Sequence, residues 1–536
     1  MIEKLLENWL DKASERSYQP VFVQMLAAEG YRVLHSTRHC LLEFGKDILA
    51  VAPDGVGCAF QLKGHPGGRL KVAEFRTDIQ PQLVQLMGQA PAYPGFPSGV
   101  HRSYLVSNGQ FEEEVQVAVR DMNQSPYPSK AELWSRGHLL DMCKQHGERL
   151  WPKELEDSRS LLELYMLNPR GMFPVERFDE LLTSVLGLGD DVEPFGRPEA
   201  IRTASSAAWV TGIAVAGFAE AQNHASVALA WAQCCVSLVG AAEKHLAGEL
   251  APIASSFDLA EAALLDSLAA LWDELQGRTS LVEGDPLADR DILGWRVTTL
   301  MGLMACLALA QRQHAVLAAS SSAALDTWLK TPRLIDVWGE GAAGALLPWC
   351  VWLRTADATT RPDDEIRAFA GYFIEANQDD APAPLASPYY LGESALGLRM
   401  RLPKHRLGLQ ETFQGNAYMA VPSLHLLVRT GLKQACRRLW ADFTRIGHRG
   451  VQLVSRSDYC RFKVRRGVET TRMYPNTYAW ADLKRDALDG DGTGMVPAAL
   501  IARPWLLAAW WQVAPHRLDA NAIRLFADAV IPGWGS

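Results

Sequence analysis

Residues 43–63, Glu43-Phe-Gly-Lys-Asp47-Ile-Leu-Ala-Val-Ala-Pro-Asp-Gly-Val-Gly-Cys-Ala-Phe-Gln61-Leu-Lys63, predict a β-hairpin with polar residues gathered at one end. A short apolar run begins at Ile48, the next turn signal is Pro-Asp-Gly, and the return strand ends at Lys63. Alternate residues of a strand face the same side, so Gln61 and Lys63 point together while Leu62 points into the core. Asp47, at the start of the neighbouring strand, can lie beside them.

This group of polar residues combines a carboxylate, a side-chain carbonyl and a lysine. Carboxylate and carbonyl oxygens are suitable ligands for a divalent metal ion, and such an ion can activate water for attack on a phosphate. The hairpin therefore predicts metal-dependent cleavage of phosphodiester bonds, with Asp47, Gln61 and Lys63 as the candidate catalytic residues.

The elements around the hairpin predict a small α/β domain over residues 1–150. A helix from Gln19 to Glu29 ends at Gly30, and a strand begins at Tyr31. After the hairpin we expect, in order, a Gln-rich helix near residues 79–89, a strand at 102–107, a helix at 111–123 and a strand at 131–134. This order predicts a mixed sheet flanked by helices.

The spacing of Asp47 and Gln61-Leu62-Lys63, after a helix that ends in Gly30-Tyr31, resembles the PD-(D/E)xK nuclease superfamily, which has the restriction-endonuclease-like fold. Within it, the chain is most similar to the Mrr-like and Holliday-resolvase-like branch, over about residues 15–145. The resemblance implies that Asp47, Gln61 and the backbone carbonyl of Leu62 bind Mg²⁺, for which Mn²⁺ can substitute. It also implies that Lys63 positions or helps to deprotonate the attacking water. By family DNA is the expected substrate, and the sequence is compatible with RNA as well.

Two positions depart from the family pattern. Gln61 stands where the family most often has Glu, and a neutral ligand weakens the affinity for Mg²⁺. The family also often has Glu on the first helix, where this chain has Gln19, which could coordinate as a neutral ligand or contact DNA. Glu43, four residues before Asp47, could supply the missing negative charge if the start of the strand bends it inward.

Two further groups of residues are predicted to contact the substrate. Gln82 and Gln85 share a face of the helix after the Lys63 strand, a helix that faces the active-site cleft in related folds. Residues 399–472 carry about 16 Lys and Arg against about 4 Asp and Glu, whereas the whole chain has a net charge of -8. Aromatic residues alternate there with the cations predicted to bind nucleic acid, which are Arg461, Lys463, Arg465 and Arg466.

The charge asymmetry of residues 399–472 indicates a partner with fixed negative charge. A small nucleotide that switches the enzyme is a second ligand compatible with this pattern. A solvated surface, or an intramolecular partner for acidic residues of the helical part, is the alternative without a ligand.

The chain changes character from about residue 155. Long Ala-, Leu- and Trp-rich segments with helical period follow one another, separated by short polar, Gly or Pro stretches. They predict a large, mainly α-helical region, for which an α-solenoid and an irregular bundle are both compatible. We expect a helical domain over residues 155–395 and a basic, mainly helical C-terminal region over residues 396–536, which sense a signal, bind a partner protein or form a homo-oligomer.

Composition indicates a globular protein of two to four domains, because 536 residues exceed one core and the apolar and charged shares are 48% and 21%. The nine cysteines lack C-x-x-C spacing, so we expect reduced thiols. The apolar stretches at residues 207–219 and 297–310 are shorter than the roughly 20 residues that cross a membrane. The first residues lack the pattern of a signal peptide, and we expect a cytoplasmic protein without a membrane segment.

Together these features predict a metal-dependent endonuclease controlled by its helical part, an arrangement that resembles effectors of bacterial restriction or anti-phage defence. The alternative is a catalytically silent nuclease fold that binds nucleic acid or scaffolds other proteins. In that case Gln61 and Gln19 would mark positions where acids were lost.

Overall fold

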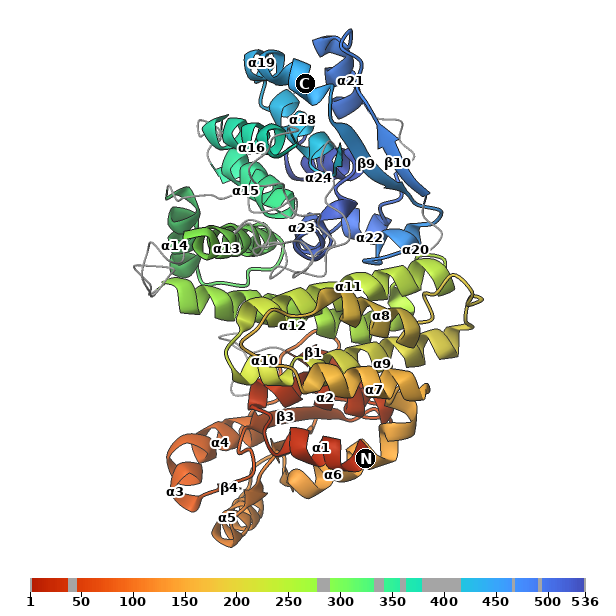
Figure 1. Cartoon of the computed structure of the whole chain (residues 1–536). Helices are drawn as coiled ribbons and strands as arrows, with labels where there is room; N and C mark the ends of the chain where they lie inside the picture. Colours follow the sequence, from red (N-terminus) through yellow and green to blue (C-terminus); the bar gives the residue numbers. More distant parts are fainter. Residues whose placement is uncertain are drawn as a thin grey trace.

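The computed structural model describes residues 2–36, 46–276, 290–331, 342–356, 363–377, 416–464, 468–489 and 494–534. An N-terminal α/β part and a C-terminal part lie at opposite ends of the molecule, with long helices between them (Figure 1).

A mixed five-stranded sheet forms the centre of the N-terminal part, in the order β1-β2-β3-β5-β7. The first three strands are antiparallel, whereas β3, β5 and β7 run parallel. The expected order of helices and strands is therefore confirmed. The strands of this sheet are β1 (Arg32–Ser36), β2 (Ile48–Val51), β3 (Gly57–Lys63), β5 (Arg102–Ser107) and β7 (Ala131–Trp134), and a separate parallel pair consists of β4 (Arg69–Leu70) and β6 (Gln110–Phe111).

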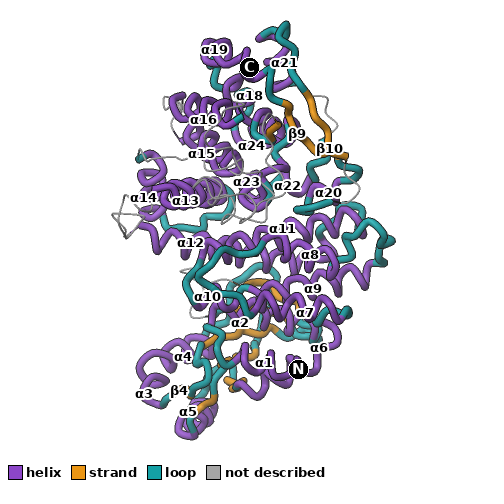
Figure 2. Tube along the Cα trace, viewed as in Figure 1, coloured by secondary structure: helices purple, strands orange, loops and turns teal. Residues whose placement is uncertain are grey.

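Helices cover both faces of the sheet (Figures 1 and 2). Phe60 and Leu62 of β3 pack in the hydrophobic cluster that includes α1, α2 and α6, whereas Ala59 packs in a second cluster with α4 and α5. Gln61 and Lys63 alternate with Phe60 and Leu62, so they lie on the face covered by α4 and α5. The helices of this part are α1 (Ile2–Leu10), α2 (Glu15–Ala28), α3 (Val72–Glu74), which continues through a π-helical turn (Phe75–Ile79) into α4 (Gln80–Gly88), α5 (Glu113–Gln124) and α6 (Arg136–Leu150).

The hydrophobic core continues from the N-terminal part into the helices that follow. α9 (Arg197–Ala214) packs against α2, and a Cβ atom at Gly212 would stand 2.8 Å from Val21 Cγ2. Val21 and Trp209 are both fully buried in one continuous cluster. The region after residue 150 is therefore built directly on the helix that covers one face of the sheet.

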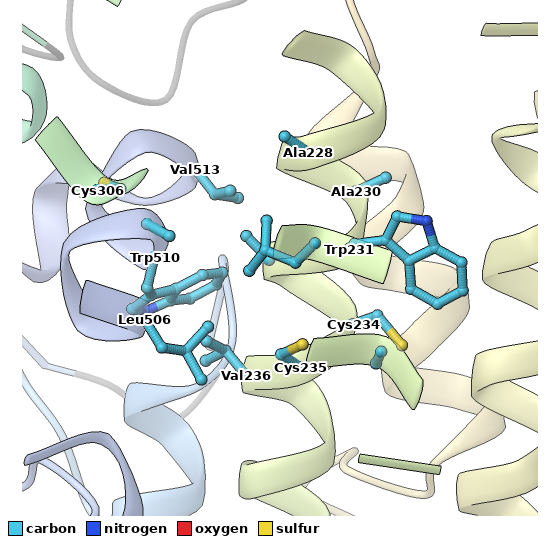
Figure 3. Packing of buried hydrophobic residues seen from close by; sticks show 14 of the residues in the cluster. Ala228, Ala230, Trp231, Cys234, Cys235, Val236, Cys306, Leu506, Trp510 and Val513 are labelled. Atoms are coloured by element: carbon cyan, nitrogen blue, oxygen red, sulfur yellow. The ribbon is translucent and has the colours of Figure 1, made fainter. Parts of the chain in front are cut away.

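Long helices dominate the rest of the described chain (Figure 2). The central helix α11 (His224–His245) packs against both α12 (Ala254–Gln276) and α23 (Pro504–Val513). Figure 3 shows Leu506 and Trp510 of α23 facing the α11 segment that contains Cys235. The expected large helical region is confirmed, while the described residues do not show a regular solenoid.

The other helices of this region are α7 (Leu155–Tyr165), α8 (Val175–Val185), α10 (Ala216–Glu220), α13 (Arg290–Gln311), α14 (Ala319–Lys330), α15 (Ala342–Ala356), α16 (Asp363–Ala376), α18 (Ala420–Arg429), α19 (Lys433–Phe443), α20 (Arg456–Tyr459), α21 (Trp480–Leu488), α22 (Ala498–Ile501) and α24 (Ala520–Val530).

A small three-stranded sheet lies in the C-terminal part, which sequence analysis expected to be mainly helical. Its strands are β8 (Asn416–Ala417), β9 (Gly447–Gln452) and β10 (Val468–Arg472), in the order β10-β9-β8. β9 contains two glycines, a histidine and an arginine, so it lacks the alternation of apolar residues that identifies a strand in a sequence.

Eight cysteines lie in the described residues, and all eight are buried and free, as expected for reduced core thiols. Among the described residues one helix, α11, is long and apolar enough to cross a membrane, and 89% of its apolar window is buried inside the protein.

Candidate functional site

The Asp47 carboxylate is held against the backbone of β3 at the open end of the hairpin. The Asp47 backbone N–H donates to the Phe60 carbonyl at 2.9 Å, and Asp47 Oδ2 accepts a hydrogen bond of 2.6 Å from the Leu62 N–H. Because Leu62 lies between Gln61 and Lys63, this bond brings the predicted carboxylate to the predicted Gln-x-Lys pair. The expected proximity of the three residues is therefore present in the structure.

The Gln61 side chain is almost completely buried and is oriented by α4. Gln61 is 1% exposed, and its Nε2 donates to Oε1 of Gln82. Its own Oε1 is buried and has no hydrogen-bond partner among the described residues. An unsatisfied buried acceptor costs about 1–3 kcal/mol, so this oxygen favours a cation or a polar hydrogen. Gln85, which was predicted to contact substrate beside Gln82, is exposed on the same helix.

Tyr18 of α2 links the first long helix to the end of β3, where the Lys63 side chain is half-buried. Its hydroxyl lies 3.2 Å from the Lys63 carbonyl and 3.4 Å from the Val106 carbonyl, and both can accept its hydrogen. Burial raises the pKa of Tyr18 well above its usual value, and the charges of Glu15 and Asp47 raise it further. Both carboxylates therefore lie within electrostatic reach of the Tyr18 hydroxyl.

Glu15 is a site residue that sequence reasoning missed. It begins α2 and packs closely on Gly64, where an added Cβ atom would stand 2.8 Å from the Glu15 amide nitrogen. The Glu15 backbone therefore lies beside the residue that follows Lys63, and Glu15 places an acid at the start of α2. It stands one helical turn before Gln19, so inspection of the whole helix for an acid would have found it.

Gln19 faces the helical region of the protein. It is 5% exposed, and its Nε2 donates to Ser36 Oγ at 3.3 Å. Gln19 also lines a cavity of about 90 Å³ whose other walls include Trp231 of α11 and Asp266 of α12. The structure thus places Gln19 at the junction between the α/β part and the long helices.

A histidine in the loop that follows Lys63 also adjoins the hairpin. His65 Nε2 lies 2.9 Å from Glu74 Oε1, and its Nδ1 lies 3.4 Å from Ser107 Oγ. Ser107 is the parallel-sheet partner of Lys63, and Asn108 Oδ1 accepts the His65 backbone N–H at 2.8 Å. The imidazole is therefore fixed two residues beyond the candidate lysine. The only feature of the sequence that points to His65 is its position two residues after Lys63.

Three predicted site residues, Glu43, Arg465 and Arg466, lie outside the described residues.

The structure does not bring the other two predicted cations to the hairpin. Arg461 is 5% exposed and pairs with Asp190 at 2.8 Å, so its guanidinium is not presented to a phosphate backbone. Lys463 pairs with Glu176 of α8. Both contacts match the alternative in which basic residues serve as intramolecular partners of acidic ones, because they join the C-terminal part to helices near α8.

The oxygen donors at the hairpin fit a divalent cation of low affinity. Asp47 offers one carboxylate, Gln61 a buried amide oxygen and Leu62 a backbone carbonyl, which are the hard oxygen ligands that Mg²⁺ prefers. Within the described part of the chain, no group of three His, Cys, Asp or Glu side chains could hold a metal ion. Glu15 is the nearest additional acid that the packing identifies.

Comparison with models of protein families, with curated proteins and with solved structures finds no match to this chain.

Proposed function

We propose that this protein is a metal-dependent nuclease with a PD-(D/E)xK, restriction-endonuclease-like domain, and that it cleaves DNA internally. The observation that carries the proposal is the Asp47 carboxylate bonded to the Leu62 amide, between Gln61 and Lys63. The mixed sheet with helices on both faces supports the same conclusion.

Each residue has a distinct role in the proposed reaction. A bound Mg²⁺ or Mn²⁺ ion supplies electrostatic stabilisation of the scissile phosphate and lowers the pKa of the attacking water. Asp47, Gln61 Oε1 and the Leu62 carbonyl would hold that ion. Lys63 stabilises the negative charge that develops on the phosphate oxygens. Tyr18 fixes the backbone at Lys63 and so limits the positions that the ammonium group can reach.

The helical region is proposed to control this reaction in the cytoplasm, by sensing a signal, by binding a partner protein or by forming a homo-oligomer. The packing of α9 on α2 supports this role, because α2 carries both Glu15 and Tyr18. A displacement of α9 would therefore reach the hairpin through one helix. A role as an effector of bacterial anti-phage defence rests on analogy of architecture alone.

A catalytically silent module that binds nucleic acid is the second candidate. It is favoured by the neutral Gln61, whose amide group already bonds Gln82. In that case the hairpin would keep its fold without the charge that a firmly bound metal requires.

Cleavage of supercoiled plasmid tests the proposal, with Lys63→Ala and the exposed Lys330→Ala as the matched pair. We expect nicking and linearisation with Mg²⁺ or Mn²⁺, none with EDTA, a loss of at least about 100-fold in Lys63→Ala and no change in Lys330→Ala. An RNA substrate in parallel decides between the two nucleic acids. Absence of cleavage by the wild-type protein, with DNA binding intact, would select the silent module.

A further inference from the structure

Helix α19 exposes a group of cations that have no partner in the described residues. Lys433, Arg437 and Arg438 are exposed on the helix, and Arg445 is exposed in the turn that follows it. None of these four side chains forms an ion pair or hydrogen bond with another described residue. The opposite side of the helix buries Cys436 and Phe443 against the core, so the cations must face solvent.

Other cations of the C-terminal part are used inside the molecule. Arg429 is buried and pairs with Asp528 at 3.2 Å, and Arg472 pairs with Asp486 at 3.1 Å. Together with the partners of Arg461 and Lys463, these contacts pair four of the twelve Lys and Arg of residues 416–472. Among the described cations of this part, Lys433, Arg437, Arg438 and Arg445 are left unpaired on α19 and the turn after it, and a further exposed cation, Arg456, lies on α20.

The positions of the α19 cations are unfavourable without an anion. Lys433 and Arg437 are four residues apart, and like charges at this spacing destabilise a helix by a few tenths of a kcal/mol. One acidic residue, Asp442, lies on the helix, near its end. A bound polyanion would relieve the repulsion between Lys433 and Arg437.

One aromatic residue, Trp440, lies on the same helix as Lys433, Arg437 and Arg438. Trp440 of α19 is half-buried, and its Nε1 donates to the Asn476 carbonyl at 3.2 Å. The Trp440 ring meets Tyr474 edge-on at 5.9 Å, and the Arg472 guanidinium lies 4.7 Å from the Tyr474 ring centre. We call Lys433, Arg437, Arg438, Arg445 and the adjoining Trp440 the α19 surface. Cations beside aromatic rings are typical of surfaces that bind nucleic acid.

The α/β part does not supply comparable charge. Residues 1–150 contain 16 Lys and Arg against 17 Asp and Glu, a net charge of -1. The pocket between α4 and α5 is lined by three acids, Glu113, Glu114 and Asp121, against one cation, Arg76, so its net charge disfavours phosphates. Because the backbone of nucleic acid is bound mainly through cations, a nuclease with this catalytic part needs a basic surface elsewhere.

We propose that the α19 surface binds the phosphate backbone of nucleic acid, at a site separate from the hairpin. Figure 1 places α19 at the end of the molecule opposite β3 and α4. The choice of nucleic acid as the polyanion rests on the proposed nuclease function. The observation that the α19 cations are unpaired is independent of that function. The surface holds one segment of the polynucleotide, while another segment, or another molecule, occupies the hairpin.

Fluorescence anisotropy with labelled duplex and single-stranded DNA tests this proposal. Binding is measured in EDTA, so that metal-dependent cleavage cannot interfere, over a series of salt concentrations. The variant is Arg437→Gln/Arg438→Gln/Arg445→Gln, and the control is Arg170→Gln/Arg197→Gln/Lys330→Gln, which removes three other exposed cations. Circular dichroism and thermal melting verify that both triple variants fold.

We expect the α19 variant to lose about 10-fold or more in affinity, and its slope of log K against log salt to fall by about 2–3. The control should keep its affinity within about threefold. Equal losses in the two variants would overturn the proposal, since net charge alone would then explain binding. Binding to phosphatidylserine vesicles but not to DNA would overturn it as well, in favour of a membrane surface.

The same variants separate the two proposals when plasmid cleavage is also measured. Loss of DNA binding in the α19 variant, with no cleavage by the wild-type protein, would support DNA binding by the α19 surface and reject the proposed nuclease activity. Metal-dependent cleavage by the wild-type protein, with unchanged DNA binding in the α19 variant, would support the proposed nuclease activity and reject the α19 surface as a DNA-binding site.

Discussion

The side-chain amide of Gln61 donates to the side-chain oxygen of Gln82, so the Gln61 oxygen is buried without a partner among the described residues. Helix α4 therefore decides which end of the Gln61 amide remains available beside Asp47. A neutral residue oriented in this way can serve a weakly bound cation, or it can simply fill the position of a lost acid.

Gln61→Glu separates these possibilities. We expect the variant to lose about 2 kcal/mol of stability in EDTA, because a buried carboxylate lacks a compensating charge. Mg²⁺ or Mn²⁺ should restore its melting temperature more than that of the wild-type protein. The measurement is thermal unfolding with and without metal, and exposed Gln85→Glu should behave as wild type. A metal response equal to that of Gln85→Glu would argue against a cation at this site.

Tyr18→Phe tests the link between α2 and the candidate lysine. Removal of the hydroxyl leaves the Lys63 and Val106 carbonyls without this donor, which should cost about 1–2 kcal/mol in urea unfolding. If the nuclease proposal holds, kcat should fall more than KM changes, because Lys63 is less well positioned. Tyr93→Phe, at a partly exposed tyrosine, is the control and should change neither quantity.

We expect the buried side chain of His448 to make the folded protein less stable in acid. Burial, together with the smaller effect of the charge of Arg472, lowers its pKa to about 3. Below pH about 6.5 the unfolded chain takes up a proton that the folded protein does not, so stability present above this pH is lost as the pH falls. The loss from this residue is about 2 kcal/mol at pH about 5.

His448→Phe should remove that part of the pH dependence, because phenylalanine does not titrate. The fold should tolerate the substitution, since neither ring nitrogen of His448 has a hydrogen-bond partner in the described residues and the ring contact with Tyr474 can remain. His425, whose pKa burial also lowers to about 3, continues to contribute. Melting curves between pH about 7 and 5 check this, with the exposed His138→Phe as the control. Identical pH profiles for the wild-type and His448→Phe proteins would contradict the prediction.

Gly212→Ala tests whether α9 and α2 form one packed unit. The added methyl would meet Val21 at 2.8 Å, and relief of this contact should cost about 1–3 kcal/mol. Gly147→Ala in α6 meets no atom within 4 Å, so it should be neutral or slightly stabilising. Limited proteolysis and thermal melting compare the two variants. A neutral Gly212→Ala would show that α2 and α9 can separate without cost.

Much of the α/β part could be predicted from the sequence, because its signals are local. The turn Pro53-Asp54-Gly55 and the apolar run after Asp47 define the hairpin, and β3, β5 and β7 have the predicted bounds. The small sheet around β9 could not be predicted, since it is held by pairing with strands distant in the chain rather than by an apolar period of its own.

The candidate site was predictable only in part. The period of a strand places Gln61 and Lys63 on one face, and the hairpin brings Asp47 to them. Glu15 and His65 reach the same place through packing of α2 on Gly64 and through the loop held by Asn108, which no local pattern encodes.

The sequence by itself determined the hairpin, the order of elements in the α/β part, and the excess of positive charge near the C-terminus. Only the tertiary structure decided which of those cations are available to a ligand. Arg461 is paired because Asp190, 271 residues away, packs beside it, whereas Arg437 pairs with no acid of the described chain. Short-range order follows from backbone preferences and periodicity, but the partner of a charge depends on which distant surfaces the folded core brings together.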